Sequence, residues 1–306
     1  MFDTPNSAVW KALVIGNTRL HWGLFKGKTL IAVQHTHHFA SVEEAEAMVS
    51  SELFISEQAE VTQISNARSL WIASVVPAQT AICAEALGSG NWAEYRTAEY
   101  RTAEYRTAEY RTAEYRTVER SHIPLANLYT TLGLDRALNL LGAKDRIGWP
   151  VLVIDAGTAL TFTAGCQQQG NAAIYGGAIS PGIRLQADAL GKGTAALTLA
   201  AKQSQDILAQ PFLPTRWACN TADAIASGLI YGVIATLSET LADWWQRFPS
   251  GQAVLTGGDG PQLHRFLQQK TPEVASRVSL DSDLMFYGMS AYRQSVLGLE
   301  PNSPGA

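Results

Sequence analysis

The sequence predicts an α/β protein built from two domains, and three observations lead to this prediction. The chain has 306 residues, which is longer than a single hydrophobic core usually serves. Short apolar runs rich in β-branched residues, typical of buried strands, are interspersed with longer stretches of helical spacing. A strand, a polar turn and a second strand occur at 11–25 and again at 151–164, so the two halves share an arrangement.

Composition and charge narrow the class of protein. An apolar fraction of 46% with 16% charged residues is ordinary for a soluble globular protein. The net charge is −4 and no basic block is present, which argues against nucleic acid and anionic membranes as partners. Cys83, Cys166 and Cys219 lack metal-site spacing and cannot all pair, which fits a reducing compartment. Met1–Lys11 lacks a signal-peptide core, and no apolar run approaches the ~20 residues of a membrane span, so a cytoplasmic protein is expected.

The first domain begins with a predicted three-stranded meander. Its strands are expected at 11–15, 20–25 and 29–34, with a polar turn at Gly16 after the first strand. The elements that follow are expected to be a helix capped by Ser41 and Glu44, a strand at 71–76 stopped by Pro77, and a helix at 78–87.

Three histidines, His35, His37 and His38, follow the meander. Histidine tracts can bind metal ions, but this one lies at a strand end with no carboxylate or cysteine beside it. We therefore favour an exposed polar loop over a metal site.

Residues 93–117 are five consecutive copies of Ala-Glu-Tyr-Arg-Thr. A period of five matches neither the helical period of about 3.6 nor the strand period of about 2, so the tyrosines share no single face. Each copy carries one Glu and one Arg, which makes the segment neutral and unlike a basic nucleic-acid platform. We interpret one copy as a native connection and four as a surface insertion with no catalytic role.

The sequence Leu-Gly-Leu-Asp-Arg at 132–136 opens a predicted helix. Gly133 stands just before Asp135 and Arg136, which places a carboxylate and a guanidinium at or near a helix N-terminus. One interpretation is a general base beside a cation that orients an anionic substrate. The alternative is an N-cap aspartate with a local salt bridge, because Asp is a favoured cap.

The second domain opens with the stretch 151–164. Val151–Ile154 is an apolar run typical of a strand buried on both faces, and it leads into Asp155. A carboxylate at the mouth of such a strand can hold a cation, Gly157 lets backbone N–H groups approach a phosphate, and Thr158 adds a hydroxyl donor. A hairpin whose Asp and Gly serve only the turn explains the same residues, so both interpretations stay open.

The rest of the second domain is expected to alternate strands and helices. Two features have both a structural and a functional explanation: Arg184 in a first helical turn could meet an anion, and Thr221 could be an N-cap or could face the cleft. The predicted elements are a strand at 173–179, a helix after Gly182, a long helix from Thr221 to Phe248, a strand at 253–255 leading into a glycine-rich turn, a helix from Pro261 and a helix at 284–297.

Together these motifs resemble those of the type III pantothenate kinases, within the superfamily of acetate and sugar kinases, heat-shock protein and actin. Any one motif is weak, but their order and spacing span nearly the whole chain apart from the repeats. The matching segments are Ile15–Arg19, Leu132–Arg136, Asp155–Ala159, Gly176–Gly182, Thr221–Gly228 and Thr256–Gly258.

The resemblance implies two ribonuclease H-like domains facing a central cleft. We place them at 1–145, including the 93–117 insertion, and at 146–300, followed by a tail at 301–306. It further implies a homodimer that uses ATP to phosphorylate pantothenate, the first step towards coenzyme A. Mg²⁺ and a monovalent cation, K⁺ or NH₄⁺, are implied as cofactors.

The resemblance also implies roles for individual residues. Asp135 would take the proton from the primary hydroxyl of pantothenate, and Asp155 would bind the monovalent cation. Pantothenate would be held by Gly133, Leu134, Asp135, Arg136, Thr221 and Tyr129, although Tyr129 lies nearer to Gly133 than in the family pattern. ATP would be contacted by Val14, Ile15, Gly16, Asn17, Thr18, Arg19, Leu20, His21 and Thr158.

Val14 is the main departure from the family pattern, which has an aspartate at this position. Valine can neither bind Mg²⁺ nor accept a hydrogen bond, so the phosphate charge would fall to Asp155, to Mg²⁺ held through the nucleotide, or to donors such as Asn17 and Thr18. The substitution leaves two further hypotheses: a non-catalytic nucleotide-binding or regulatory accessory protein on the same fold, or a kinase of another small alcohol.

Overall fold

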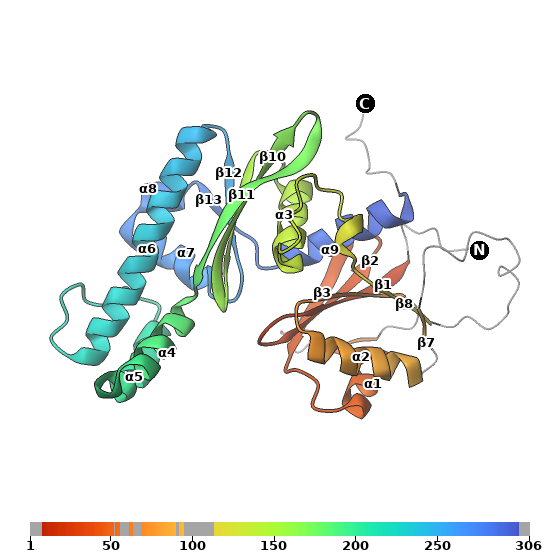
Figure 1. Cartoon of the computed structure of the whole chain (residues 1–306), viewed down its shortest axis with the longest axis horizontal. Coiled ribbons are helices and arrows are strands. Elements are labelled where there is room, and N and C mark those ends of the chain that lie inside the picture. Colours follow the sequence, from red (N-terminus) through yellow and green to blue (C-terminus); the bar gives the residue numbers. More distant parts are fainter. Residues whose placement is uncertain are drawn as a thin grey trace, which may run out of the picture. The chain divides into compact units, whose positions relative to one another are not determined.

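The computed structural model describes residues 8–51, 53–55, 61–63, 69–89, 92–94 and 113–299. By its contacts the chain divides into two compact units, whose elements are labelled in Figure 1. Unit 1 comprises Met1–Pro124, Gly133–Leu138 and Phe286–Ala306, and unit 2 comprises Leu125–Leu132 and Asn139–Met285. This grouping places the last helix with unit 1, whereas the proposed domain boundary after residue 145 assigns that helix to the second domain. The predicted tail at 301–306 lies outside the described residues.

Unit 1 is built on a six-stranded sheet of order β3-β2-β1-β6-β8-β7. The first three strands form an antiparallel meander, and β6, β8 and β7 add to it in parallel. The strands are β1 Val9–Ile15, β2 Leu20–Lys26, β3 Thr29–Thr36, β6 Ser69–Ser74, β7 Trp92–Glu94 and β8 Ala113–Thr117, and a separate pair consists of β4 Leu53–Ile55 and β5 Val61–Gln63. The predicted meander is therefore confirmed.

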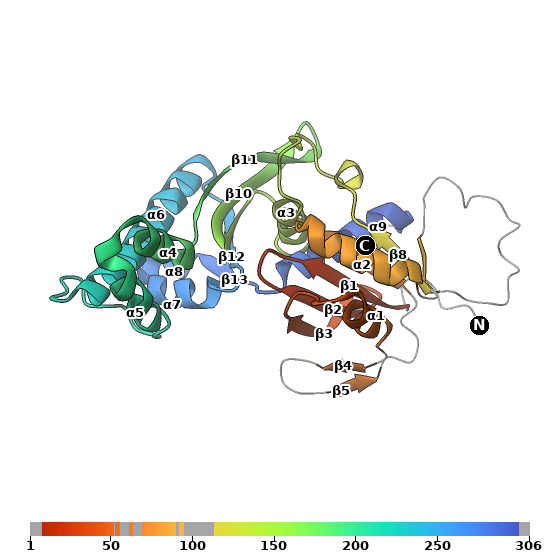
Figure 2. The ribbon, with the colours of Figure 1, turned by 60° about the horizontal axis from the view of Figure 1, so that its bottom comes forward.

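Helices cover both faces of the unit 1 sheet. On one face α1 (Val42–Ser50) and α2 (Pro77–Ser89) lie side by side and bury Leu13 and Ile15 of β1 (Figure 2). On the other face α9 (Leu284–Leu297) contacts β2, since a Cβ placed on Gly23 would lie 2.7 Å from Phe286. Cβ atoms alternate between the faces of a strand, so Val14 belongs to the α9 face.

Unit 2 is built on a five-stranded sheet of order β11-β10-β9-β12-β13. Its first three strands are antiparallel, and β12 and β13 follow in parallel. The strands are β9 Val151–Ala156, β10 Ala159–Gln168, β11 Asn171–Pro181, β12 Gln252–Thr256 and β13 Val278–Leu280. The helices of unit 2 are α4 Ile183–Gly193, α5 Thr198–Leu208, α6 Thr221–Arg247, α7 Gly260–Lys270 and α8 Pro272–Ala275, with a 3₁₀ turn at Ala195–Leu197. α3 Leu134–Arg146 begins in unit 1 and continues into unit 2, and a 3₁₀ turn at Arg120–His122 belongs to unit 1.

The two sheets share one connectivity. In each, a hairpin strand and a third antiparallel strand lie on one side of the first strand, and parallel strands lie on the other side. The prediction of two α/β domains built on the same strand–turn–strand unit is thus confirmed. The internal similarity was visible in the sequence because a buried strand followed by a tight turn leaves a strong local pattern.

Several predicted details need correction. Asn220, not Thr221, caps α6, because its side chain accepts a hydrogen bond from the Asp223 backbone N–H at 3.0 Å. α6 has 27 residues and a mean hydropathy of 1.4 over its most apolar window, so the expectation that no run approaches a membrane span was wrong. Half of that window is buried in the structure, and its apolar stripe packs into the unit 2 core.

The repeat segment was only partly anticipated. Its last copy, Ala113–Thr117, is not a connection but the strand β8, paired on one side with β6 and on the other with β7. Arg116 of this copy is 9% exposed and stacks over Trp71 at 4.9 Å. The copies within 95–112 lie outside the described residues.

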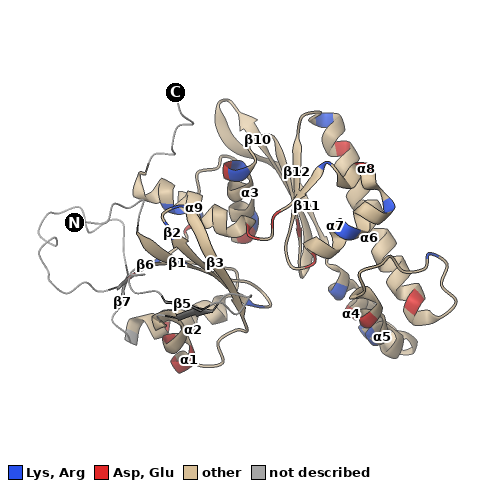
Figure 3. Cartoon of the chain, turned by 180° about the vertical axis from the view of Figure 1, so that it is seen from behind, with Lys and Arg blue, Asp and Glu red and all other residues tan. Residues whose placement is uncertain are grey.

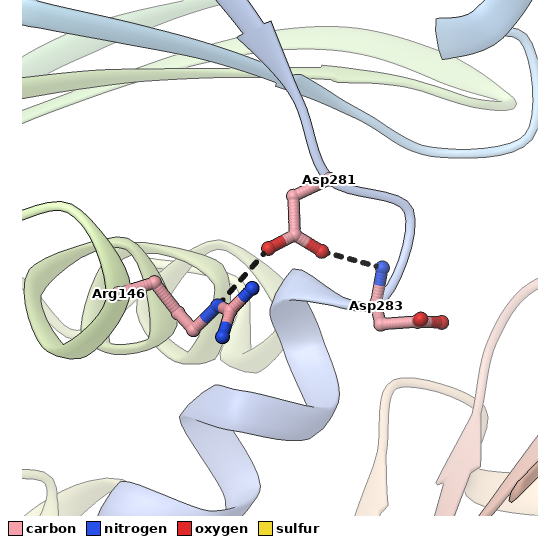
Figure 4. Close-up of polar contacts among 3 residues, drawn as sticks. All are labelled: Arg146, Asp281 and Asp283. Atoms are coloured by element: carbon pink, nitrogen blue, oxygen red, sulfur yellow. Dashed lines mark hydrogen bonds and ion pairs between the residues drawn. The ribbon is translucent and has the colours of Figure 1, made fainter.

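Charged residues of both signs lie along the described helices (Figure 3). One ion pair ties the C-terminal end of α3 to the segment after β13: Arg146 Nε lies 3.4 Å from Asp281 Oδ2, and Asp281 Oδ1 accepts from the Asp283 N–H (Figure 4). Arg146 is about half exposed, so such a pair contributes roughly 0.2–1 kcal/mol. Because this ion pair contributes so little, the part of α3 that lies in unit 2 is held mainly by its buried residues.

Candidate functional site

The turn between β1 and β2 places an exposed polar segment at the end of a buried strand. The Gly16 N–H donates to the Arg19 carbonyl at 3.0 Å, which closes the turn. Asn17, Thr18 and Arg19 are exposed. Val14, Ile15 and Leu20 are each 5% exposed or less, so only their backbone is placed to meet a ligand.

The histidines around this turn are not an exposed loop, which corrects the sequence interpretation. His35 lies in β3, and its Nδ1 is 2.9 Å from Nδ1 of His21 on β2. His38 Nε2 lies 2.8 Å from the Gly16 carbonyl oxygen and can only donate to it. His37 is the exposed member of the tract. In the part of the chain that the structure describes, no three His, Cys, Asp or Glu side chains come together as a metal site.

The turn between β9 and β10 has the same place in its sheet but is shorter and has different chemistry. The Gly157 N–H donates to the Ala159 carbonyl at 3.0 Å, and Thr158 is exposed. Asp155, the last residue but one of β9, is partly buried, and its Oδ2 accepts a hydrogen bond from Asn139 Nδ2 at 2.9 Å. The hairpin interpretation of this stretch is therefore correct for the backbone, and the carboxylate lies near the strand end.

Asn139 is a site residue that the sequence analysis missed. It is 1% exposed, and its Oδ1 has no hydrogen-bond partner among the described residues. An unsatisfied buried oxygen costs about 1–3 kcal/mol, so it marks a place where a ligand is expected. The available signal was its position four residues after Asp135 on a predicted helix, which brings it to the same helical face.

The glycine-rich segment after β12 packs against the second turn. Gly257 has φ +86°, and a Cβ at this position would collide with Asp155 Oδ1 and the Ala156 carbonyl oxygen. The Asp259 N–H donates to the same carbonyl at 2.9 Å. Burial raises the pKa of the Asp259 carboxyl, and the nearby Arg184 opposes that shift. Arg184 thus faces a carboxylate within unit 2.

A small pocket opens beside this turn within unit 2. Its lining is mostly apolar, and Asp259 is the charged residue in it. The lining residues are Ala156, Gly157, Leu160, Gly182, Ile183, Val233, Asp259 and Leu263. Backbone groups at Gly157 and Gly182 also meet here, because the Gly182 N–H donates to the Thr158 carbonyl at 3.0 Å.

Asp135 lies in the first turn of α3, not at its cap. The Ala137 N–H donates to the Gly133 carbonyl at 3.2 Å, and Asp135 Oδ1 accepts from the Arg136 N–H at 2.8 Å. The carboxylate folds back over Gly133, where a Cβ would collide with Oδ1, so a side chain at this position would displace the carboxylate. Arg136 is 5% exposed, which places its guanidinium inside the fold.

The remaining predicted substrate residues are divided between the units, with Tyr129 and Thr221 in unit 2 and Leu134 in unit 1. Tyr129 is 44% exposed, and its carbonyl accepts from the Leu132 N–H at 3.0 Å. Thr221 is exposed at the first position of α6. Leu134 is partly buried at the start of α3.

Comparisons with known proteins show the family of the chain. The family model described as type III pantothenate kinase matches residues 12–243. A type III pantothenate kinase from Nostoc sp. is 38% identical over 289 residues, covering 92% of this chain and 92% of the relative. One from Synechocystis sp. is 35% identical over 289 residues, covering 94% of this chain and 92% of the relative.

A solved structure also shares the fold. The protein, described as a Baf family transcriptional activator from Campylobacter jejuni, has a TM-score of 0.53 and 17% sequence identity. The alignment covers 94% of this chain and all of that chain. At this identity the likeness concerns the fold, and the membership rests on the family model and the curated relatives. The chain belongs to the type III pantothenate kinase family.

Proposed function

We propose that the protein transfers the γ-phosphoryl group of ATP to the primary hydroxyl of pantothenate, giving 4′-phosphopantothenate and ADP, the first step of coenzyme A synthesis. Its support is the family membership together with the Asp135 carboxylate at the N-terminus of α3. The proposal also takes over the family expectations of a homodimer in the cytoplasm.

Asp135 is assigned the role of general base. One carboxylate oxygen accepts the Arg136 N–H, which fixes the rotamer, and the carboxylate takes the proton of the pantothenate hydroxyl as that oxygen bonds to the γ-phosphorus. The bond from this phosphorus to the β,γ-bridging oxygen breaks, and ADP leaves. Gly133, Leu134, Arg136, Tyr129 and Thr221 are assigned to holding pantothenate.

The two turns are assigned to ATP. Asn17, Thr18 and Arg19 present exposed donors on the first turn, and Thr158 presents a hydroxyl on the second. Mg²⁺, when bound, would neutralise charge on the phosphates. The first turn offers it no carboxylate, because Val14 holds the position of the family aspartate and is buried.

Asp155 and Asn139 fit a monovalent cation. Hard cations prefer oxygen ligands, and Asn139 Oδ1 is a buried carbonyl-type oxygen without a partner among the described residues. Its amide nitrogen holds Asp155 Oδ2, and Asp155 Oδ1 and the Ala156 carbonyl oxygen both approach Gly257, where a side chain would fill the space. The cation, when bound, would place positive charge at the acid-bearing turn.

The proposal is tested with purified protein, Mg·ATP and a panel of alcohols that includes pantothenate, with and without K⁺. We expect K⁺-dependent ADP release with pantothenate. Release with a different alcohol would support another kinase substrate, and ATP binding without turnover would support the accessory-protein hypothesis that Val14 motivates.

The role of Asp135 has its own test. Asp135→Asn should lower kcat at least about 100-fold, since general-base catalysis contributes roughly 10²–10⁴. The folding transition and ATP affinity should stay close to those of the parent, which circular dichroism and calorimetry would check. Near-normal turnover in the folded variant would remove Asp135 from the mechanism.

A further inference from the structure

A cross-strand row of side chains crosses the unit 1 sheet beside the first turn. In the antiparallel registers Val14 lies opposite His21, and His21 lies opposite His35. Directly opposed residues of antiparallel strands project from the same face and are close neighbours. An imidazole therefore stands next to the valine that replaces the family aspartate.

The two ring nitrogens of His21 face different partners. Nδ1 lies 2.9 Å from His35 Nδ1, and the two rings meet edge to face at 74°. Nε2 lies 3.4 Å from the place that a Cβ on Gly16 would occupy, so it borders the turn. Nδ1 is thus engaged by His35 of β3, and Nε2 borders the turn at Gly16.

The pair shares one proton between its facing nitrogens. Burial, His35 and Arg19 lower the pKa of His21 to about 4, so its ring is neutral at neutral pH. In a neutral imidazole one nitrogen donates and the other accepts. If His35 donates to His21 Nδ1, His21 carries its own proton on Nε2, towards the turn. In the reverse arrangement Nε2 is an acceptor and would repel an anion.

We infer that His21 donates from Nε2–H to a phosphate oxygen of the nucleotide, and that His35 is the positioning residue that fixes this tautomer. The inference rests on the proposed function, because it assigns nucleotide phosphate to the Gly16–Arg19 turn. Phosphate oxygens only accept hydrogen bonds, so they select the arrangement with Nε2–H. His38 has a separate part: its hydrogen bond to the Gly16 carbonyl holds the backbone of the turn.

With His21 as a donor, the first turn binds phosphate in a different way from a turn that carries an aspartate. An aspartate acts on phosphate through a metal ion, whereas an imidazole N–H and the Arg19 guanidinium bind the anion directly. Arg19 is exposed in the turn, and its charge is one of the causes that lower the pKa of His21. These neighbouring donors can bind phosphate where Val14 provides no carboxylate.

The tautomer can be observed directly in the full-length protein labelled with ¹⁵N-histidine. Two-bond ¹H–¹⁵N correlation spectra distinguish protonated Nε2 from protonated Nδ1, with and without Mg·ADP. We expect His21 to carry its proton on Nε2 and its Nε2 signal to shift on addition of Mg·ADP. A proton on Nδ1 of His21 in the complex would overturn the inference.

Matched substitutions of His35 test its positioning role. His35→Leu should weaken ADP binding about tenfold, the size of one good hydrogen bond to a charged group, and leave adenosine binding unchanged. His35→Asn can place an amide N–H near the former Nδ1 and should restore most of the affinity. His37→Leu, an exposed neighbour in the same tract, is the control and should bind ADP as the parent does.

Titration calorimetry with ADP and adenosine separates this inference from the proposed function. Equal ADP affinity in the parent and His35→Leu would overturn the inference even if pantothenate is phosphorylated. An adenosine affinity that falls as much as ADP affinity would also overturn it, since the effect would not lie at the phosphates. A selective loss for ADP would support it even in a protein with no turnover of pantothenate.

Discussion

The β1–β2 turn and the β9–β10 turn have the same place in their sheets and opposite electrostatics. Each follows a buried central strand and is closed by a glycine N–H donating to a carbonyl two or three residues on. The second turn carries a carboxylate supported by Asn139, whereas the first carries a buried valine, an exposed arginine and neighbouring histidines. The negative charge of the second turn favours a bound cation, and the positive charge of the first turn favours a bound anion.

The same strand–turn–strand unit can therefore bind two different kinds of ligand. The turn geometry comes from glycine and strand pairing, which both sheets share. The charge comes from Asp155 near the end of β9 and from Arg19 in the first turn, and neighbouring elements add polar side chains, Asn139 of α3 in one unit and His35 of β3 in the other. Each turn can therefore change its ligand without a change of fold.

Among the substitutions that test this difference between the turns, Asp155→Asn is expected to have the largest effect. We expect kcat to fall about 100-fold or more, because the charge at the acid-bearing turn is removed. The rise in unfolding temperature that K⁺ causes in the parent should disappear as well. Thermal unfolding in KCl and in an equal concentration of a bulky organic cation salt measures this effect, and an unchanged K⁺ response would place the cation elsewhere.

The second test uses pH. The pKa of His21 is lowered from 6.5 to about 4, so protonation favours the unfolded chain between these values. His21 thus costs no stability above pH 6.5, and its unfavourable contribution grows as pH falls to 4, to at most about 3 kcal/mol. His21→Gln should flatten that part of the urea-measured stability curve. Parallel curves for the parent and the variant would mean that His21 takes up a proton as readily in the folded protein as in the unfolded chain.

Val14→Asp tests whether the two turns can be made alike. Val14 is 5% exposed, so the new carboxylate should cost roughly 2 kcal/mol of stability. Part of that cost should be offset because the nearby carboxylate raises the pKa of His21, visible as a change of its ¹⁵N signals. Mg²⁺ should raise the unfolding temperature of the variant more than that of the parent. Equal Mg²⁺ responses would show that an acid at this position does not create a metal ligand.

The smallest effect is expected from shortening the repeat segment. Removing any four copies leaves one copy followed by Val118, which can still form β8, although β7 then loses its Ala93 and Glu94. Turnover and K⁺ response should remain within about twofold of the parent, because none of the residues assigned to either turn lies in the repeats. A folded deletion variant without activity would give the repeats a role that neither turn explains.

Sequence reasoning identified both turns but not what lies beside them. The strands around Gly16 and Gly157 were predictable from apolar runs and glycine turns, and so were α1, α6 and α9. The contacts of Asn139 with Asp155 and of His35 with His21 join residues 16 and 14 positions apart, which no local pattern encodes. β8 was missed because a repeated segment was assumed to be an insertion, whereas strand pairing selects its last copy.

The placement of β8 makes the sheet insensitive to the number of copies. Every copy has the same five residues, but only the last is followed by Val118, whose N–H donates to the Ile72 carbonyl at 2.7 Å, and by Glu119, whose N–H donates to Tyr292. Gain or loss of copies between the first and the last therefore changes the length of the chain before β8 and leaves the strand's own residues in register. The paired residues of β7 and β8 stay the same as long as these two copies remain, because Ala93 and Glu94 of the first copy belong to β7.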